Sequence, residues 1–117
     1  MAKLSVDKGK RWERAVASSI SEVMPGARIR RGDQSRDGAD APDVICPWLW
    51  VECKSGKRPN PRAALAQAIE ASSRRGSKAV PTVFLKDDRK DPIVILQMDD
   101  FLRMLKKLWH TKLNQER

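Results

Sequence analysis

Two adjacent strand-like segments near the middle of the chain limit the possible folds more than any other feature. Residues 43–46 and 48–54 are rich in apolar and β-branched residues, and Pro47 between them is typical of a tight turn joining paired strands. Side chains of a strand alternate between its two faces. One face of the second segment therefore carries Trp48, Trp50, Glu52 and Lys54, and the other carries Leu49, Val51 and Cys53. The chain is expected to build a sheet around this pair.

The flanking patterns predict helices and further strands. Apolar residues recur every three or four positions in the first segment, and Pro25 with Gly26 ends that pattern. Small residues favour a second helix, and Asp99 or Asp100 is expected to cap a third. The predicted helices cover residues 7–24, 62–73 and 99–113, and the further strands cover 27–31, 80–86 and 93–98. A loop rich in Gly, Asp and Ser is expected over residues 32–41.

The resulting order of elements is helix, three strands, helix, two strands, helix. This order predicts the α/β class, with a central mixed sheet of about five strands flanked by helices. At 117 residues with 40% hydrophobic content, the chain fits one compact domain spanning residues 1–117.

The composition limits the classes of binding partner and the types of metal ligand that this chain can have. Twenty-four Lys and Arg against fifteen Asp and Glu give a formal charge of +9, which favours a polyanion, with nucleic acid as the first candidate. Only two cysteines and one histidine are present, so any metal must be held by oxygen. Cys46 and Cys53 are interpreted as small buried apolar residues. No apolar run is long enough for a membrane span or a secretory signal, so we expect a cytoplasmic protein with no membrane partner. We also expect no organic cofactor.

Asp43, Glu52 and Lys54 form the candidate reaction centre. If the two central strands pair, both carboxylates converge at one end of the hairpin, with the main-chain carbonyl of Cys53 between them. Such oxygens suit Mg²⁺, with Mn²⁺ expected to substitute. The ammonium of Lys54 could orient water or stabilise negative charge. Glu13 would complete the site from the first helix, directly or through water.

The same residues also fit a simpler interpretation, in which Glu52 and Lys54 form an ion pair on a solvated face of the sheet. Three further features favour hydrolysis of a phosphodiester: an Asp after proline nine residues earlier, an acid on a helix, and basic flanks. The basic flanks form three clusters that could follow a phosphate backbone. Their members are Lys8, Lys10, Arg11 and Arg14; Arg28, Arg30, Arg31 and Arg36; and Lys57, Arg58 and Arg62.

These residues resemble the PD-(D/E)xK nucleases of restriction-endonuclease-like fold, and within them the Holliday junction resolvases of archaea and some phages. The resemblance rests chiefly on residues 8–14, 42–45 and 51–55, and extends over 68–76 and 79–85. It implies divalent-metal-dependent cleavage by a homodimer, with Glu13, Asp43 and Glu52 as metal-site acids and Lys54 as catalytic lysine. It also implies a functional loop serine, for which Ser35 is the nearest candidate, and a supporting polar residue at Gln67.

The expected function is a magnesium-dependent DNA endonuclease that makes paired nicks in four-way junctions. A nuclease for flaps, single strands or duplex DNA is the first alternative, and a non-catalytic nucleic-acid-binding module is the second. The last helix carries an apolar stripe wider than one small sheet requires, and the sequence leaves open whether it is a dimer face or a core helix. That stripe contains Phe101, Leu102, Met104, Leu105, Leu108, Trp109 and Leu113.

Overall fold

The computed structural model describes residues 2–32 and 40–116. Its helices are α1 (Ala2–Val23), α3 (Pro61–Arg74) and α4 (Met98–Gln115), and its strands are β1 (Arg30–Arg31), β2 (Val44–Ile45), β3 (Leu49–Gly56), β4 (Val80–Asp87) and β5 (Ile93–Ile95). The predicted order of elements is confirmed. The first, second and fifth strands are shorter than the sequence pattern predicted, β3 extends two residues further, and α1 begins five residues earlier.

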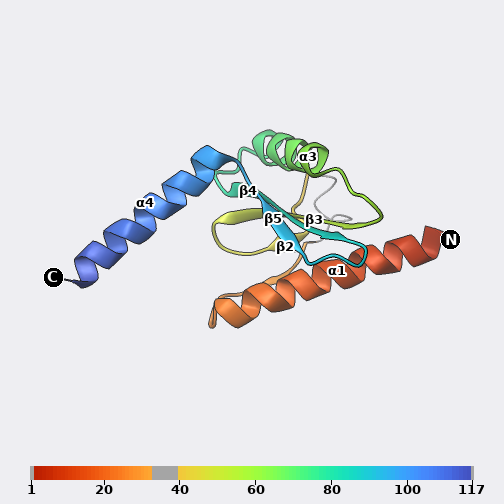
Figure 1. Cartoon of the computed structure of the whole chain (residues 1–117), viewed down its shortest axis with the longest axis horizontal. Helices are drawn as coiled ribbons and strands as arrows, with labels where there is room; N and C mark the ends of the chain where they lie inside the picture. Colours follow the sequence, from red (N-terminus) through yellow and green to blue (C-terminus); the bar gives the residue numbers. More distant parts are fainter. Residues whose placement is uncertain (1, 33–39, 117) are drawn as a thin grey trace.

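The strands form one mixed sheet in the order β1-β2-β3-β4-β5. Only β3 and β4 run parallel, with Glu52 opposite Val83, and the other neighbouring pairs are antiparallel. The parallel pair requires a crossover connection, which α3 supplies. Helices α1 and α3 lie against opposite faces of the sheet (Figure 1). The expected five-stranded α/β architecture is therefore confirmed.

The two faces of β3 lie in two separate apolar cores, and its side chains divide between these faces as the alternation predicted. Trp50 is buried against small residues of α3, in a cluster that also holds Val83 and Leu85. Val51 is buried on the other face, against Val16 of α1 and its neighbours. Because alanines recur on the inner side of α3, this helix can approach the sheet closely. Strand β3 is thereby fixed from both sides.

The two later helices begin differently. Asn60 caps α3, because its side-chain oxygen accepts a hydrogen bond from the N–H of Ala63 at 3.1 Å, and Pro61 occupies the first turn. The predicted aspartate cap of α4 is wrong. Gln97 occupies the cap position without a side-chain hydrogen bond, and Asp99 and Asp100 lie inside the first turn. There, their negative charges complement the positive end of the helix dipole.

Gly32 follows β1 in a place that admits no side chain. Its N–H donates to the carbonyl of Asp43 at 2.9 Å, and a Cβ built on it would lie 1.8 Å from the carbonyl oxygen of Pro42. The substitution Gly32→Ala must displace backbone rather than a flexible side chain. We expect it to lower the free energy of unfolding by about 2–3 kcal/mol, measured by urea denaturation followed by circular dichroism.

Gly9 provides the matched control for this prediction. It lies within α1, and a Cβ at this position would meet nothing within 4 Å. Alanine is the better helix former, so Gly9→Ala should raise stability by up to about 1 kcal/mol. Equal effects of the two substitutions would contradict the steric role assigned to Gly32.

Candidate active site

Asp43 is anchored at the edge of β3, just before β2 begins. Its main-chain N–H donates to the carbonyl of Val51 at 2.8 Å, and its Oδ2 accepts a hydrogen bond from the N–H of Cys53 at 2.8 Å. The residue is only 7% exposed. The two bonds fix both the backbone and the carboxylate of Asp43 relative to β3.

The main-chain carbonyl of Cys53 lies at the same edge of β3. The pairing of β2 with β3 stops at Val44 opposite Val51, so β2 does not cover the following residues of β3. Within a strand, the N–H and C=O of one residue point toward the same neighbour. Since the N–H of Cys53 points to Asp43, its carbonyl oxygen does so too. The carbonyl and the Asp43 carboxylate therefore lie at the same edge of β3, and the role of this carbonyl as a metal ligand stays a prediction.

The charges of three acids affect the pKa of the Cys53 thiol. Burial raises the pKa of the Cys53 thiol, and the nearby charges of Asp43, Glu13 and Glu52 raise it further, so the thiol stays protonated. Each of these acids comes from a different part of the chain: α1, the segment before β2, and β3. The structure therefore places all three acids within electrostatic range of Cys53.

The environment of Asp43 and Glu52 disfavours the charged form of both carboxyl groups. Burial raises the pKa of Glu52 to about 7, with a further contribution from the charge of Asp43. Burial also raises the pKa of Asp43 to about 6, although the hydrogen bond from Cys53 opposes the shift. The positive charge of Lys54 favours the ionised form of both acids. Carboxylates with such raised pKa values are typical of functional sites, where the carboxylate binds a proton or a metal ion during the reaction.

Glu13 is held beside the site by a partner on β1. Trp12 secures this part of α1, because its indole N–H donates to the carbonyl of Phe84 at 2.9 Å. The Glu13 Oε1 accepts from Nε and pairs with Nη2 of Arg31, each at 3.1 Å. The sequence analysis missed this pairing. It favours a role for Glu13 through water over direct ligation of a metal, because Arg31 already binds one of its oxygens.

The donor set of this site fits a small hard cation. No group of three His, Cys, Asp or Glu side chains within residues 2–32 and 40–116 stands ready to hold a metal ion. The set consists instead of two carboxylates, from Asp43 and Glu52, and one main-chain oxygen. Mg²⁺ keeps several of its waters and binds proteins through one or two carboxylates, so this smaller set suits it.

Basic residues gather around the ends of β3 and β4 nearest the site. Lys8 of α1 forms an ion pair with Asp88, just after β4. The N–H of Arg58 donates to Asp87 Oδ1 at 3.2 Å, and the N–H of Asp88 donates to the carbonyl of Gly56 at 2.8 Å. The basic clusters of Lys8 and Arg58, 50 residues apart in the sequence, are thereby held at one end of the sheet by Asp88 and Asp87.

The predicted DNA-contacting residues differ in whether their side chains already pair with an acid of the chain. Lys8 and Arg31 already pair with acids of the chain. The other described members are exposed and form no ion pair with a described acid: Lys10, Arg11, Arg14, Arg28, Arg30, Lys57, Arg58 and Arg62. Ser35 and Arg36 lie outside the described residues. The role of all these residues stays a prediction.

Gln67 lies on the flank of α3 that turns away from β5. Ala64, Ala68 and Ala71 face the sheet, and Ile69 lies on one side of this buried row, beside the end of β5. The helical repeat of 3.6 residues places Gln67 on the other side of the row, toward β3 and the site. Gln67 is exposed, and its supporting role stays a prediction.

A second ion pair that the sequence analysis missed fixes the chain before Asp43. Arg74, near the end of α3, donates to Asp40 Oδ1 at 2.6 and 2.9 Å. This hydrogen bond holds the pKa of Asp40 below its usual range. The basic residue in the last turn of α3 was a visible signal, but its partner on a loop 34 residues away was not.

Comparison with known proteins identifies a fold neighbour. The structure is similar to that of Hjc, a Holliday junction resolvase from the archaeal hyperthermophile Archaeoglobus fulgidus, with a TM-score of 0.52 and 20% sequence identity, over 74% of this chain and 73% of that chain. No family model and no curated protein matches the sequence. The chain therefore shares the α/β fold of this neighbour, with the mixed sheet of five strands that its sequence predicted.

Proposed function

We propose that this protein is a metal-dependent DNA endonuclease that acts in the cytoplasm as a homodimer and makes paired nicks in four-way junctions. The observation that carries the proposal is the placement of Asp43 and Glu52. Both are largely buried at one edge of β3, and burial raises the pKa of both. Such a pair opposes folding when it is ionised, so a functional role explains it better than a structural one.

The residues of the chain can each perform a step in phosphodiester hydrolysis. Asp43, Glu52 and the Cys53 carbonyl would hold a Mg²⁺ ion, which supplies positive charge for the phosphate oxygens and lowers the pKa of a bound water. Lys54 lies on the same face of β3 as Glu52. Its ammonium would then stabilise the charge that develops on the phosphate or orient the attacking water. Glu13 would fix a water from the α1 side.

The pattern of ion pairs disfavours the interpretation of Glu52 and Lys54 as a structural ion pair. Six ion pairs occur among the described residues, and neither Glu52 nor Lys54 belongs to any of them. A non-catalytic binding module would need no such acids beside its basic surface. The net charge of +9 and the exposed basic residues near β3 support DNA as the partner in either case.

A cleavage experiment with several DNA structures tests the proposal. Incubation with a synthetic four-way junction and Mg²⁺ should give symmetrically paired nicks, and Mn²⁺ should replace Mg²⁺. Linear duplex of the same sequence should be cut at least about tenfold more slowly, since it binds only through the backbone contacts. The products are measured by denaturing gel electrophoresis, with the metal chelator EDTA as the control.

Two outcomes of this experiment separate the alternatives. Faster cleavage of flaps, single strands or duplex than of the junction would keep the chemistry and replace the substrate. Binding to DNA without any metal-dependent cleavage would reject the nuclease and leave a binding module.

A further inference from the structure

Helix α4 projects away from the rest of the molecule (Figure 1). Residues 101–116 are all exposed, although the helix carries a broad apolar stripe. Met98 is 71%, Leu108 65% and Trp109 57% exposed. A helix of this kind gains little stability from its own side chains and normally depends on packing. The exposed stripe therefore calls for a partner that buries it.

The total accessible surface of the chain is larger than that of a compact monomer of the same mass. The accessible surface is 8806 Å², for a mass of 13.3 kDa. A compact monomer of this mass exposes about 6,500 Å², so roughly 2,300 Å² are in excess. Stable interfaces bury about 800 Å² per partner, and obligate homodimers often bury more. An excess of this size, to which the projecting helix α4 contributes, is large enough for a stable dimer contact.

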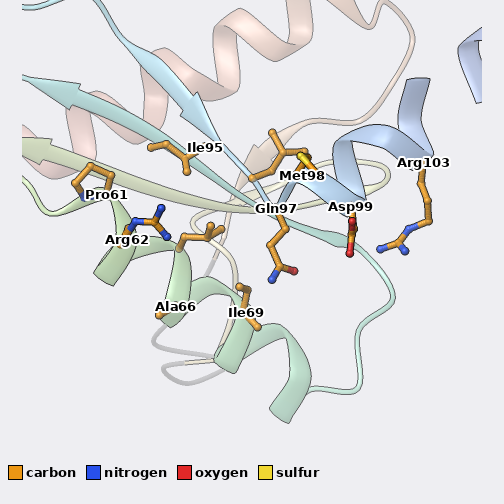
Figure 2. Close-up of a pocket in the computed structure, with 11 residues that line it drawn as sticks. Pro61, Arg62, Ala66, Ile69, Ile95, Gln97, Met98, Asp99 and Arg103 are labelled. Carbon is orange, nitrogen blue, oxygen red and sulfur yellow. The ribbon is translucent and has the colours of Figure 1, made fainter. Parts of the chain in front are cut away.

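A groove opens at the base of the same helix (Figure 2). It has a volume of about 850 Å³ and lies between α3, the end of β5 and the start of α4. Leu65, Ile69, Ile95 and Met98 give it apolar walls, and Arg62 and Asp99 lie at its polar rim. The groove adjoins the stripe through Met98, which lines the groove and lies on the same side of α4 as Leu105.

We infer that the occupant is a second copy of this chain, with the two α4 helices packed antiparallel. In this arrangement, the outer half of each helix, with Trp109 and Leu113, lies over the groove at the base of the other. The contact is isologous, since one copy supplies both the stripe and the groove. Each apolar surface thereby meets an apolar surface of the partner.

The charges along α4 favour an antiparallel pair of identical helices. Asp99 lies in the first turn of the helix, whereas Lys112 lies in the last. The helical repeat places Lys112 within the apolar stripe, close to the direction of Leu105. In an antiparallel pair, the acidic start of one helix lies beside the basic end of the other, and a parallel pair would bring like charges together. The helix dipoles also attract one another in the antiparallel arrangement.

The interface leaves the candidate active site open. Strand β5 is one edge of the sheet, whereas Asp43 lies by β2, near the opposite edge. A dimer through α4 would therefore present two uncovered sites. The use of these two sites for paired nicks rests on the proposed nuclease function, whereas the assembly itself does not.

Sedimentation of the full chain, without DNA or metal, tests the inference. The wild type should have twice the mass of one 13.3-kDa chain over a concentration series. Leu105→Glu places a charge in the centre of the stripe and should weaken dimerisation at least about a hundredfold. Leu105 belongs to neither apolar core of the sheet, so the sheet with α1 and α3 should stay folded in the variant, which circular dichroism checks. Leu108→Glu is the second variant, and the same loss is expected.

Lys107→Glu is the matched control, because Lys107 lies on the side of α4 opposite Leu105. This variant should remain dimeric. A wild type that is monomeric at every concentration, or dimers that persist in both stripe variants, would overturn the inference. Binding of a monomeric wild type to vesicles of anionic lipid would instead assign the stripe to a membrane surface. A dimeric wild type that fails to cut DNA would reject the proposed function and leave the interface intact.

Discussion

Replacing Glu52 with Gln is expected to reduce metal-dependent cleavage of DNA by at least about a thousandfold. The amide keeps the size of the side chain but lacks the negative charge that attracts a divalent cation. Because Glu52 is one of only two carboxylates in the proposed donor set, the remaining Asp43 and Cys53 oxygens would hold the ion weakly. Single-turnover cleavage of the junction at saturating protein measures the effect independently of DNA affinity.

The matched control is Glu22→Gln, which makes the same chemical change on the exposed side of α1. This variant should cut at the wild-type rate. DNA binding by Glu52→Gln should equal or exceed that of the wild type, since the change removes a negative charge near the proposed phosphate path. Unchanged cleavage by a clean Glu52→Gln protein would refute the assignment of the metal site.

The metal-free protein is expected to lose stability as the pH rises from 5 to 8. The folded-state pKa values are about 7 for Glu52 and about 6 for Asp43, against ordinary values of 4.5 and 3.8. The folded state therefore binds more protons than the unfolded state between about pH 4 and 7, and stability falls as the pH rises through this window. For Glu52 alone, a shift of this size corresponds to about 3 kcal/mol. Urea denaturation in the presence of EDTA measures the slope.

Two comparisons isolate the contribution of the site. Glu52→Gln should be more stable than the wild type at pH 8 without metal and nearly equal to it at pH 4, where Glu52 is mostly protonated in both states. Mg²⁺ should raise the stability of the wild type at pH 8, since a bound ion favours the folded, ionised site. It should raise that of Glu52→Gln far less. Equal pH slopes for the two proteins would contradict the burial of a charged Glu52.

The local patterns of the sequence were sufficient for the order of elements. Alternation along β3 predicted that Trp50 and Val51 would lie on opposite faces of the strand, and each is buried in a different core. This prediction was possible because the strand repeat depends only on neighbouring residues. The cap of α4 was predicted wrongly for the same local reason. Aspartate is common both as a cap and in the first turn, and spacing alone does not separate these positions.

The sequence by itself therefore determined the fold class, the positive charge and the residue types that a phosphodiester-cutting site needs. Only the tertiary structure decided how these residues act on one another. It paired Glu13 with Arg31, bound Asp43 to the N–H of Cys53, and left the stripe of α4 exposed. The physical reason is that pKa values, ion pairs and burial depend on distances between segments far apart in the chain. Such distances exist only once the sheet and its two covering helices have formed.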